Sequence, residues 1–243
     1  QGLTELKDFQ KLVKLQVLYL DGNELTELPE SISKCSHLQI IHATKNQLNA
    51  LPRSFTKLKN LEELHLRFNS LTKLPRGMER LVNLKLLDLR DNQLSSLPEV
   101  LTTLPELQIL EVAYNNIQAL PENMGGLGAL WKLNISGNPI PALPTSFVQL
   151  SSLEECYLGD THLSMTNATA LLLPLGQLYV LDLSGLALQG LPASYAQLPA
   201  LKRLDLTRAG MNAAATAALL QGGATPTPAR CHRAIAKLAS PQD

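Results

Sequence analysis

Three side chains that could bind a metal ion recur at intervals of 23 residues: His42, His65 and Asp88. Imidazole nitrogens and carboxylate oxygens are common ligands of zinc. Neighbouring strands lie about 4.8 Å apart, so equivalent positions on successive strands would place the three side chains side by side. Flat adjacent strands rarely converge their side chains on one point. We therefore favour a solvated row on a recognition surface and expect no metal and no other cofactor.

The sequence also lacks the motifs of the common enzyme classes. Gly125, Gly126 and Gly128 are followed by no Lys-Ser or Lys-Thr pair, so they do not form a phosphate-binding loop. No serine lies in a nucleophile elbow. The cysteine pairs of zinc fingers and zinc deaminases are missing. We expect no enzymatic activity within this chain.

A repeat of 23 residues determines which elements carry these side chains. Leucine makes up 54 of the 243 residues and aromatic residues only 4%. Within one unit, Leu87 and Leu89 are two residues apart, so they lie on one face of a strand, and residues 86, 88 and 90 lie on the other. The leucines that open the units are Leu15, Leu38, Leu61, Leu84, Leu107, Leu130, Leu153, Leu178 and Leu201. One unit cannot bury its leucines alone, so the repeat predicts a solenoid with a parallel sheet along one side.

Asparagine and proline mark the turns of each unit. An Asn side chain can both donate and accept hydrogen bonds, so it can bind backbone groups that no strand pairs. The predicted Asn ladder consists of Asn23, Asn46, Asn69, Asn92, Asn115 and Asn138. It is interrupted at Thr161, Leu186 and Ala209. The prolines that follow the ladder end the strand geometry and fix the return path of the chain; they are Pro29, Pro52, Pro75, Pro98, Pro121 and Pro144.

This pattern, from Leu84 to Pro98 in one unit, closely resembles the leucine-rich repeat family in its 23-residue Leu-Pro form. The resemblance covers roughly residues 12–210. The chain is similar in this respect to intracellular proteins such as the Ras suppressor, plant Ras-group-related proteins, scribble-type scaffolds and the repeat domains of Roco proteins. The resemblance implies an α/β fold: a right-handed horseshoe with a parallel sheet on its concave face. Extended or 3-10 turns are expected on the convex face.

The chain divides into three parts by its pattern. Residues 1–11 are a partial repeat or an N-terminal cap, 12–221 form the repeat domain of about nine units, and 222–243 are a linker and a C-terminal capping segment. A few short helices are expected near the C-terminus. One covers 166–173, with Thr166 or Asn167 as its N-cap, and another covers 212–220.

The cysteines indicate the compartment. Cys35 and Cys156 fall on apolar repeat positions, where burial as small hydrophobic residues is expected. With Cys231 they make an odd, scattered set that favours a reducing environment. No run of 18 apolar residues is present, so we expect no membrane insertion. The prediction is a cytoplasmic protein.

The exposed strand positions supply a candidate binding surface. The middle row consists of Tyr19, His42, His65, Asp88, Glu111, Asn134, Tyr157, Asp182 and Asp205. The outer row consists of Asp21, Thr44, Arg67, Arg90, Ala113, Ser136, Gly159, Ser184 and Thr207. Aromatic and Arg side chains are the types that anchor protein interfaces. The candidate partner-binding residues on the concave face are His42, His65, Arg67, Phe68, Asp88, Arg90, Glu111, Tyr114 and Trp131.

Charge is unevenly distributed along the chain, although the net formal charge is zero. Residues 53–90 contain nine Lys or Arg and four acidic residues, a balance of plus five. Residues 91–160 contain eight acidic residues and one Lys, a balance of minus seven. Such a dipole can orient a charged partner. The basic half lacks stacking aromatic residues and the acidic half repels phosphate, so no direct contact with nucleic acid is expected.

These features favour a protein-binding scaffold with a rigid concave surface, acting in signalling or in the assembly of a larger complex. The partner is expected to be a protein, and the chain could be one subunit of several. Two alternatives remain open. One is a structural subunit of a cytoskeletal or ribonucleoprotein assembly, bound through its edges and ends. The other is the substrate-recognition domain of a larger enzyme, such as a Roco GTPase or a ubiquitin ligase.

Overall fold

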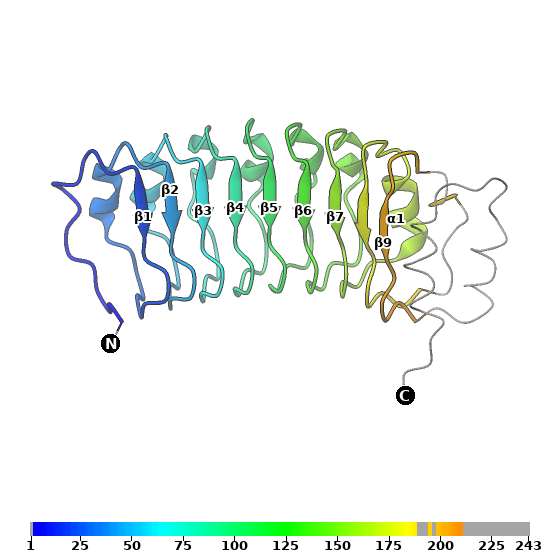
Figure 1. Cartoon of the computed structure of the whole chain (residues 1–243), viewed down its shortest axis with the longest axis horizontal. Coiled ribbons are helices and arrows are strands. Elements are labelled where there is room, and N and C mark those ends of the chain that lie inside the picture. The colour runs from blue at the N-terminus through cyan, green and yellow to red at the C-terminus, as the bar shows by residue number, and fades with distance from the viewer. Residues whose placement is uncertain (1, 189–193, 196–197, 211–243) are drawn as a thin grey trace.

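Successive units of the chain lie side by side and form one open sheet of parallel strands, as the computed structural model shows (Figure 1). The structure describes residues 2–188, 194–195 and 198–210. The strands pair in sequence order from β1 to β9. They are β1 (Val17–Tyr19), β2 (Ile40–His42), β3 (Glu63–His65), β4 (Leu86–Asp88), β5 (Ile109–Glu111), β6 (Lys132–Asn134), β7 (Glu155–Tyr157), β8 (Val180–Asp182) and β9 (Arg203–Asp205). The predicted solenoid with a parallel sheet is confirmed.

Short 3-10 helices lie on the return path between strands, as predicted. Pro29, Pro52, Pro98 and Pro144 directly precede four of them, because a proline has the φ angle of such a start and donates no hydrogen bond. The six described segments are η1 (Glu30–Lys34), η2 (Arg53–Lys57), η3 (Met78–Arg80), η4 (Glu99–Thr103), η5 (Met124–Gly126) and η6 (Thr145–Gln149).

The core is a column of leucines between the sheet and the 3-10 segments. Leu87 and Leu89 are fully buried, as their spacing predicts. Ile32, Phe55 and Phe147 close the far side of their units and are also fully buried. Each unit covers the leucines of its neighbour, so the core is continuous along the solenoid.

The Asn ladder is confirmed by its hydrogen bonds. Asn92 Oδ1 accepts a bond from the backbone N–H of Leu71 in the preceding unit at 2.9 Å. Its Nδ2 donates to the carbonyls of Leu66 and Leu89 at 2.9 and 3.0 Å. Asn46, Asn69, Asn115 and Asn138 repeat both kinds of bond. The ladder stops where it was expected to: Thr161 donates a single bond, to the Leu158 carbonyl.

Each strand is followed by a residue with a positive φ angle, which turns the chain away from the sheet. We call these residues the turn row: Gly22, Lys45, Phe68, Asp91, Tyr114, Gly137, Asp160, Gly185 and Arg208. Their φ angles lie between 50° and 68°. Only glycine adopts this region freely, so the six other residues carry a local conformational cost that the repeat imposes.

The first residues extend the pattern of the repeat. Leu3 donates its backbone N–H to Asn23 Oδ1 at 2.8 Å, as Leu25 does to Asn46 one unit later. Phe9 is buried at the position that Ile32 occupies in the next unit. The predicted division at residue 11 stays a prediction.

One helix is described near the C-terminal end, α1 (Met165–Leu172). The helix expected at 166–173 is therefore confirmed, but its N-cap is Ser164 and not Thr166 or Asn167. Ser, Thr and Asn all favour the N-cap position, so residue type alone did not distinguish Ser164 from the two predicted candidates. The helix expected at 212–220 and the segment 222–243 lie outside the described residues. No helix in the described part of the chain is long and apolar enough to cross a bilayer.

Two of the three cysteines lie in the described part of the chain. Cys35 and Cys156 are both buried and free, as expected from their repeat positions. Burial raises the pKa of both thiols. They act as small hydrophobic residues of the core. Cys231 lies outside the described residues.

Candidate functional site

The exposed side of the sheet, which we call the sheet face, carries the middle row, the outer row and a third row. This inner row consists of Val17, Ile40, Glu63, Leu86, Ile109, Lys132, Glu155, Val180 and Arg203. The register pairs His42 with His65 and His65 with Asp88, as the spacing predicted. The candidate residues of the middle and outer rows therefore lie on one continuous surface.

The N-terminal end of the middle row is a column of three stacked rings. The rings of Tyr19 and His42 lie 4.9 Å apart, and those of His42 and His65 lie 4.1 Å apart with 7° between their planes. Burial lowers the pKa of His42, and the positive charge on a protonated His65 lowers it further. Parallel stacked rings do not direct their nitrogens at one point. No group of three or more His, Cys, Asp or Glu is arranged to hold a metal among the described residues.

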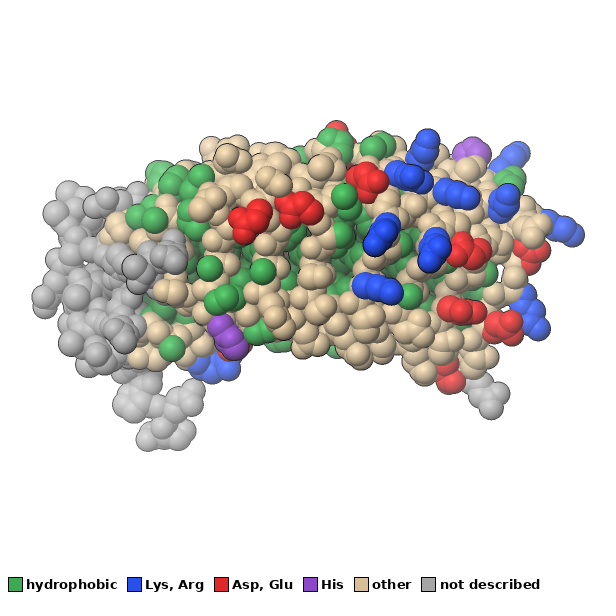
Figure 2. Space-filling model, turned by 180° about the vertical axis from the view of Figure 1, so that it is seen from behind, with side chains coloured by type: hydrophobic (Ala, Val, Ile, Leu, Met, Phe, Trp, Pro, Cys, Tyr) green, Lys and Arg blue, Asp and Glu red, His purple; other side chains and the backbone are tan. Residues whose placement is uncertain are grey.

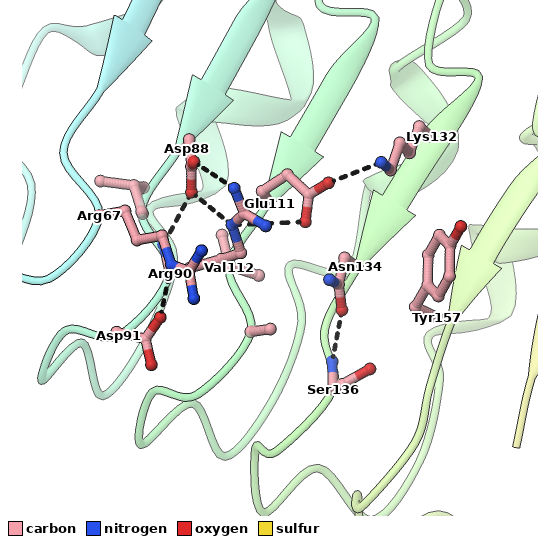
Figure 3. A network of polar contacts seen from close by, with 12 residues as sticks. Arg67, Asp88, Arg90, Asp91, Glu111, Val112, Lys132, Asn134, Ser136 and Tyr157 are labelled. Atoms are coloured by element: carbon pink, nitrogen blue, oxygen red, sulfur yellow. Dashed lines mark hydrogen bonds and ion pairs between the residues drawn. The ribbon is translucent and has the colours of Figure 1, made fainter. Parts of the chain in front are cut away.

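The centre of the sheet face is a network of charged side chains (Figure 3). Arg90 donates from Nε to Asp88 Oδ1 at 2.9 Å and from Nη2 to Asp88 Oδ2 at 2.6 Å. Its Nε also lies 3.8 Å from Glu111 Oε2. The side chains of Asp88 and Glu111 are each only 7% exposed. A bidentate guanidinium pair of this kind is among the stronger polar contacts of proteins.

The network continues over the next two strands. Lys132 Nζ lies 3.0 Å from Glu111 Oε1 and 3.7 Å from Glu155 Oε2. Glu155 also accepts bonds from the hydroxyls of Tyr157 at 3.0 Å and Tyr179 at 2.6 Å. We call Asp88, Arg90, Glu111, Lys132 and Glu155 the charged network. It links side chains from strands β4 to β7 without a gap.

Two pKa shifts follow from the contacts of Glu155. Burial raises the pKa of the Glu155 carboxyl, but the two tyrosine hydroxyls and the Lys132 ammonium outweigh burial and keep that pKa below its usual value. Burial, and then the bond to Glu155, raises the pKa of Tyr157 to about 12. Glu155 is therefore an ionised acceptor that holds both hydroxyls in place.

One atom of the network is left without a hydrogen bond. Glu111 Oε2 is buried and accepts none from the described residues, because Arg90 lies 3.8 Å away and Lys132 binds the other oxygen. A buried carboxylate oxygen usually has a donor, so this atom carries a desolvation cost.

Exposed aromatic residues of the turn row border the charged network. The guanidinium of Arg67 lies 4.3 Å from the centre of the Phe68 ring and bonds to Asp91 at 2.8 Å. Tyr114 packs over the backbone of Gly137, where a Cβ atom would lie only 2.5 Å from the ring. Phe68 remains 40% exposed and Tyr114 55% exposed. Packing beside the turn thus leaves much of both rings available to a partner.

Trp131 lies apart from the other candidates. It directly precedes β6 and donates its backbone N–H to Gln108, outside the rows of the sheet face. Its side chain lines a shallow groove with Glu154 and Tyr179. The sequence placed it at the start of the sixth strand, and the strand begins one residue later.

The sheet face and the opposite face of the solenoid differ in charge. The rows of the sheet face and the turn row contain nine acidic and six basic residues, a balance of minus three. Arg67 and Arg90 are both paired with carboxylates on this face. Exposed Lys34, Arg53 and Lys57 lie on η1 and η2 instead. Figure 2 shows Lys and Arg gathered on the opposite face, in the half near the N-terminus.

Sequence reasoning missed the part of the network that lies on the inner row. Lys132 and Glu155 extend the pairing of Asp88, Arg90 and Glu111 into one network. The missed signal was the inner row itself, which carries apolar residues in five units but opposite charges at Lys132 and Glu155 in successive units.

Comparison with known proteins identifies the type of repeat. The family model described as "Leucine-rich repeat region" matches residues 1–85 and 76–172. No curated protein matches the chain in sequence.

Three solved structures share the fold. A leucine-rich repeat protein of Leptospira interrogans aligns with a TM-score of 0.80 at 32% identity, over 85% of this chain and 52% of that one. A TDR receptor gives 0.72 at 28% identity, over 81% and 35%. The ectodomain of the Arabidopsis thaliana receptor kinase GASSHO1/SCHENGEN3, solved in complex with CASPARIAN STRIP INTEGRITY FACTOR 2, gives 0.72 at 24% identity, over 83% and 25%. The chain thus spans about half of the first protein and about a third of the second.

Proposed function

Because the chain belongs to the leucine-rich repeat family, we propose that it is a non-catalytic scaffold that binds a protein partner through its sheet face. The partner would be recruited in signalling or in the assembly of a larger complex. The Arabidopsis relative of the same fold was solved in complex with another factor, which supports binding as the general role.

The charged network is the observation that carries this proposal. The backbone does not need these charges, since equivalent positions in other units are occupied by Asn134, Ala113 and Gly159. The side chains are nevertheless largely buried and paired before any partner arrives. Binding to side chains that are already ordered costs less conformational entropy than binding to flexible ones. Exposed Phe68 and Tyr114 next to the network are residues of the kind that anchor interfaces.

The partner would carry more basic than acidic groups at the contact. The sheet face and turn row together have a balance of minus three, and a complementary charge speeds association and disfavours wrong partners. Binding should accordingly weaken as salt is raised, since exposed charges are screened within about 10 Å at 0.1 M ionic strength.

A capture experiment with two matched variants tests the proposal. The double variant Phe68→Asn and Tyr114→Asn removes both aromatic rings and keeps a residue that tolerates positive φ. The control, Val82→Asn and Val148→Asn, removes two exposed apolar residues that lie off the sheet face. Proteins captured from the source cells by wild type and control, but at least tenfold depleted with the Phe68 and Tyr114 variant, are the expected outcome. Equal capture by all three proteins contradicts it.

We also propose a cytoplasmic location. The support is that both described cysteines are free, buried thiols on the repeat pattern, as a reducing compartment allows. Fractionation of cells that express the tagged chain would test this, and recovery in the secreted or membrane fraction would contradict it.

A further inference from the structure

A shallow groove of about 780 Å³ lies at the end of the sheet where β6, β7 and β8 begin. Two aromatic residues, Trp131 and Tyr179, line it together with the carboxylate of Glu154. Ser151, Ser152 and Gln177 add polar groups to the lining. The volume is within the usual range of pockets that bind small groups.

The backbone places Trp131, Glu154 and Tyr179 side by side in this order. Each directly precedes a strand, and they occupy the same position in three successive units. Glu154 donates its backbone N–H to Trp131 at 2.8 Å, and Tyr179 donates to Glu154 at 2.9 Å. Adjacent strands are about 4.8 Å apart, so the backbones of Trp131 and Tyr179 lie about 10 Å apart with Glu154 between them. The carboxylate is thus flanked on both sides by aromatic residues.

Glu154 is unusual among the charged residues of this edge. Within the part of the chain that the structure describes, its exposed side chain makes no hydrogen bond or ion pair. Glu62, at the same position of an earlier unit, is paired with Lys85 at 2.7 Å. An exposed carboxylate between two aromatic residues, without a cation of its own, is complementary to a positively charged group.

Tyr179 already faces one cation. The ammonium group of Lys202 lies 6.0 Å from the centre of its ring. The hydroxyl of Tyr179 donates to Glu155 at 2.6 Å, which fixes the ring relative to the groove. Aromatic faces attract cations, and the planar guanidinium of arginine stacks on them while its N–H groups bind a carboxylate.

We propose that this groove binds an arginine side chain presented by a protein segment, with Glu154 as the counter-ion and Trp131 and Tyr179 as the walls. The segment of sequence that supplies Trp131 and Glu154 is acidic overall, because residues 91–160 contain eight acidic residues and one Lys. The groove lies outside the rows of the sheet face, so the proposal goes beyond the proposed function and does not depend on it.

Trp131 is the only tryptophan of the chain, so its fluorescence reports directly on the groove. The probe is the capped tripeptide acetyl-Gly-Arg-Gly-amide, titrated into the full chain. Its comparison peptide contains citrulline, which has nearly the shape of arginine but no charge. The arginine peptide is expected to change the Trp131 emission saturably, with an affinity at least fivefold higher than that of the citrulline peptide. Equal affinities, or a response that does not saturate, overturn the proposal.

Two carboxylate variants locate the binding. Glu154→Gln is expected to weaken binding of the arginine peptide at least fivefold and to remove its advantage over citrulline. Glu122→Gln is the control, since it removes another exposed carboxylate that does not line the groove and should leave the affinity unchanged. Both variants should melt at the wild-type temperature, because neither side chain makes a described bond. Retention of the arginine preference in Glu154→Gln overturns the proposal.

Two variants of Tyr179 distinguish the contribution of its ring from that of its hydroxyl. Tyr179→Phe keeps the aromatic wall and should retain the arginine preference, whereas Tyr179→Leu should weaken binding at least threefold. The opposite order would show that the ring does not form a wall of the site. The peptide assay involves no natural partner, so its result stands apart from the outcome for the sheet face.

Discussion

Arg90 donates to both carboxylate oxygens of Asp88, two residues earlier in the same unit, at 2.9 and 2.6 Å. The next strand places Glu111 beside Asp88 in register, and Arg90 approaches this second carboxylate at 3.8 Å. Both carboxylates are 7% exposed; Arg90 compensates the charge of Asp88, and Lys132, 3.0 Å from Glu111, compensates most of the second. Arg90 therefore stabilises the sheet face in addition to shaping it.

Replacement of Arg90 by Met should destabilise the chain. The change keeps most of the apolar stem but leaves Asp88 without its partner, and unpaired buried charges are costly. The loss should be about 2 kcal/mol, below the value for a fully buried pair because Arg90 is itself 30% exposed. Urea unfolding followed by circular dichroism measures it. Arg67→Met is the control: this pair is more exposed, and the loss should stay below about 1 kcal/mol. Equal losses of stability in Arg90→Met and Arg67→Met would show that burial of the Asp88 carboxylate does not increase the cost of removing its partner.

Replacement of Asn92 by Ala tests the Asn ladder. The buried Asn92 amide accepts a hydrogen bond from the Leu71 N–H and donates to the Leu66 and Leu89 carbonyls. Alanine leaves these three backbone groups without this partner in the core. Each lost partner of a buried group costs roughly 1–3 kcal/mol, so a total of about 3 kcal/mol is expected. Thermal melting measures the effect. Asn83→Ala, which removes one exposed bond to Lys59, should cost less than about 0.5 kcal/mol. A small effect at Asn92 would mean that water replaces the amide.

Stability should depend on pH through His42. Its pKa is lowered by burial and then by His65, while Asp21 and Glu63 act in the opposite direction and the Tyr19 ring covers one face. A lowered histidine pKa means that the unfolded chain binds the proton more readily than the folded chain. His42 should thus cost no stability above about pH 6.5, the usual value of histidine, and should destabilise the fold as pH falls below it.

The variant His42→Gln isolates this contribution. The glutamine side chain at position 42 does not titrate. The stability difference between wild type and variant should therefore shift in favour of the variant as the pH falls from about 7 to about 5. Chemical unfolding at each pH gives the difference. His37→Gln, which removes an exposed imidazole, is the control for the loss of a histidine alone. A pH-independent difference for His42→Gln would show that the pKa of His42 is the same in the folded and unfolded chains.

The positive φ angle of Phe68 predicts an unusual order of stability among variants at this position. Its φ angle is 55°, a region that Asn adopts easily and a β-branched residue adopts poorly. Phe68→Ile should therefore be less stable than Phe68→Asn by on the order of 1–2 kcal/mol, although isoleucine is the more hydrophobic replacement. Melting temperatures of the two variants give the order. A more stable Phe68→Ile would contradict the description of this turn.

The repeat fold could be predicted almost completely because it depends on periodicity. The spacing of Leu87 and Leu89 determined which side chains are buried, and the recurrence of Asn92 determined the ladder. The row of His42, His65 and Asp88 followed from the same period. The start of α1 at Met165 was missed by one residue, because Ser164, Thr166 and Asn167 are all residue types that favour an N-cap.

Contacts between side chains were harder to predict than their positions. Spacing placed Arg90 and Glu111 on one face, but it could not show that Arg90 turns back to Asp88 or that Lys132 bridges two acids. Such contacts depend on rotamers and on competition among several partners. Trp131 was assigned to the sheet face by its neighbourhood in sequence, whereas a one-residue offset moves it to the groove.

Site-directed photo-crosslinking tests most directly whether the sheet face binds the partner. A benzophenone amino acid would replace Tyr114 on the turn row in one protein and Val82, an exposed residue off the sheet face, in another. Irradiation in the presence of a partner captured by wild type, followed by mass spectrometry, identifies the contact. A crosslinked partner is expected from position 114 and none from position 82. A crosslink from position 82 alone would show that the partner binds away from the sheet face, which would contradict binding through that face.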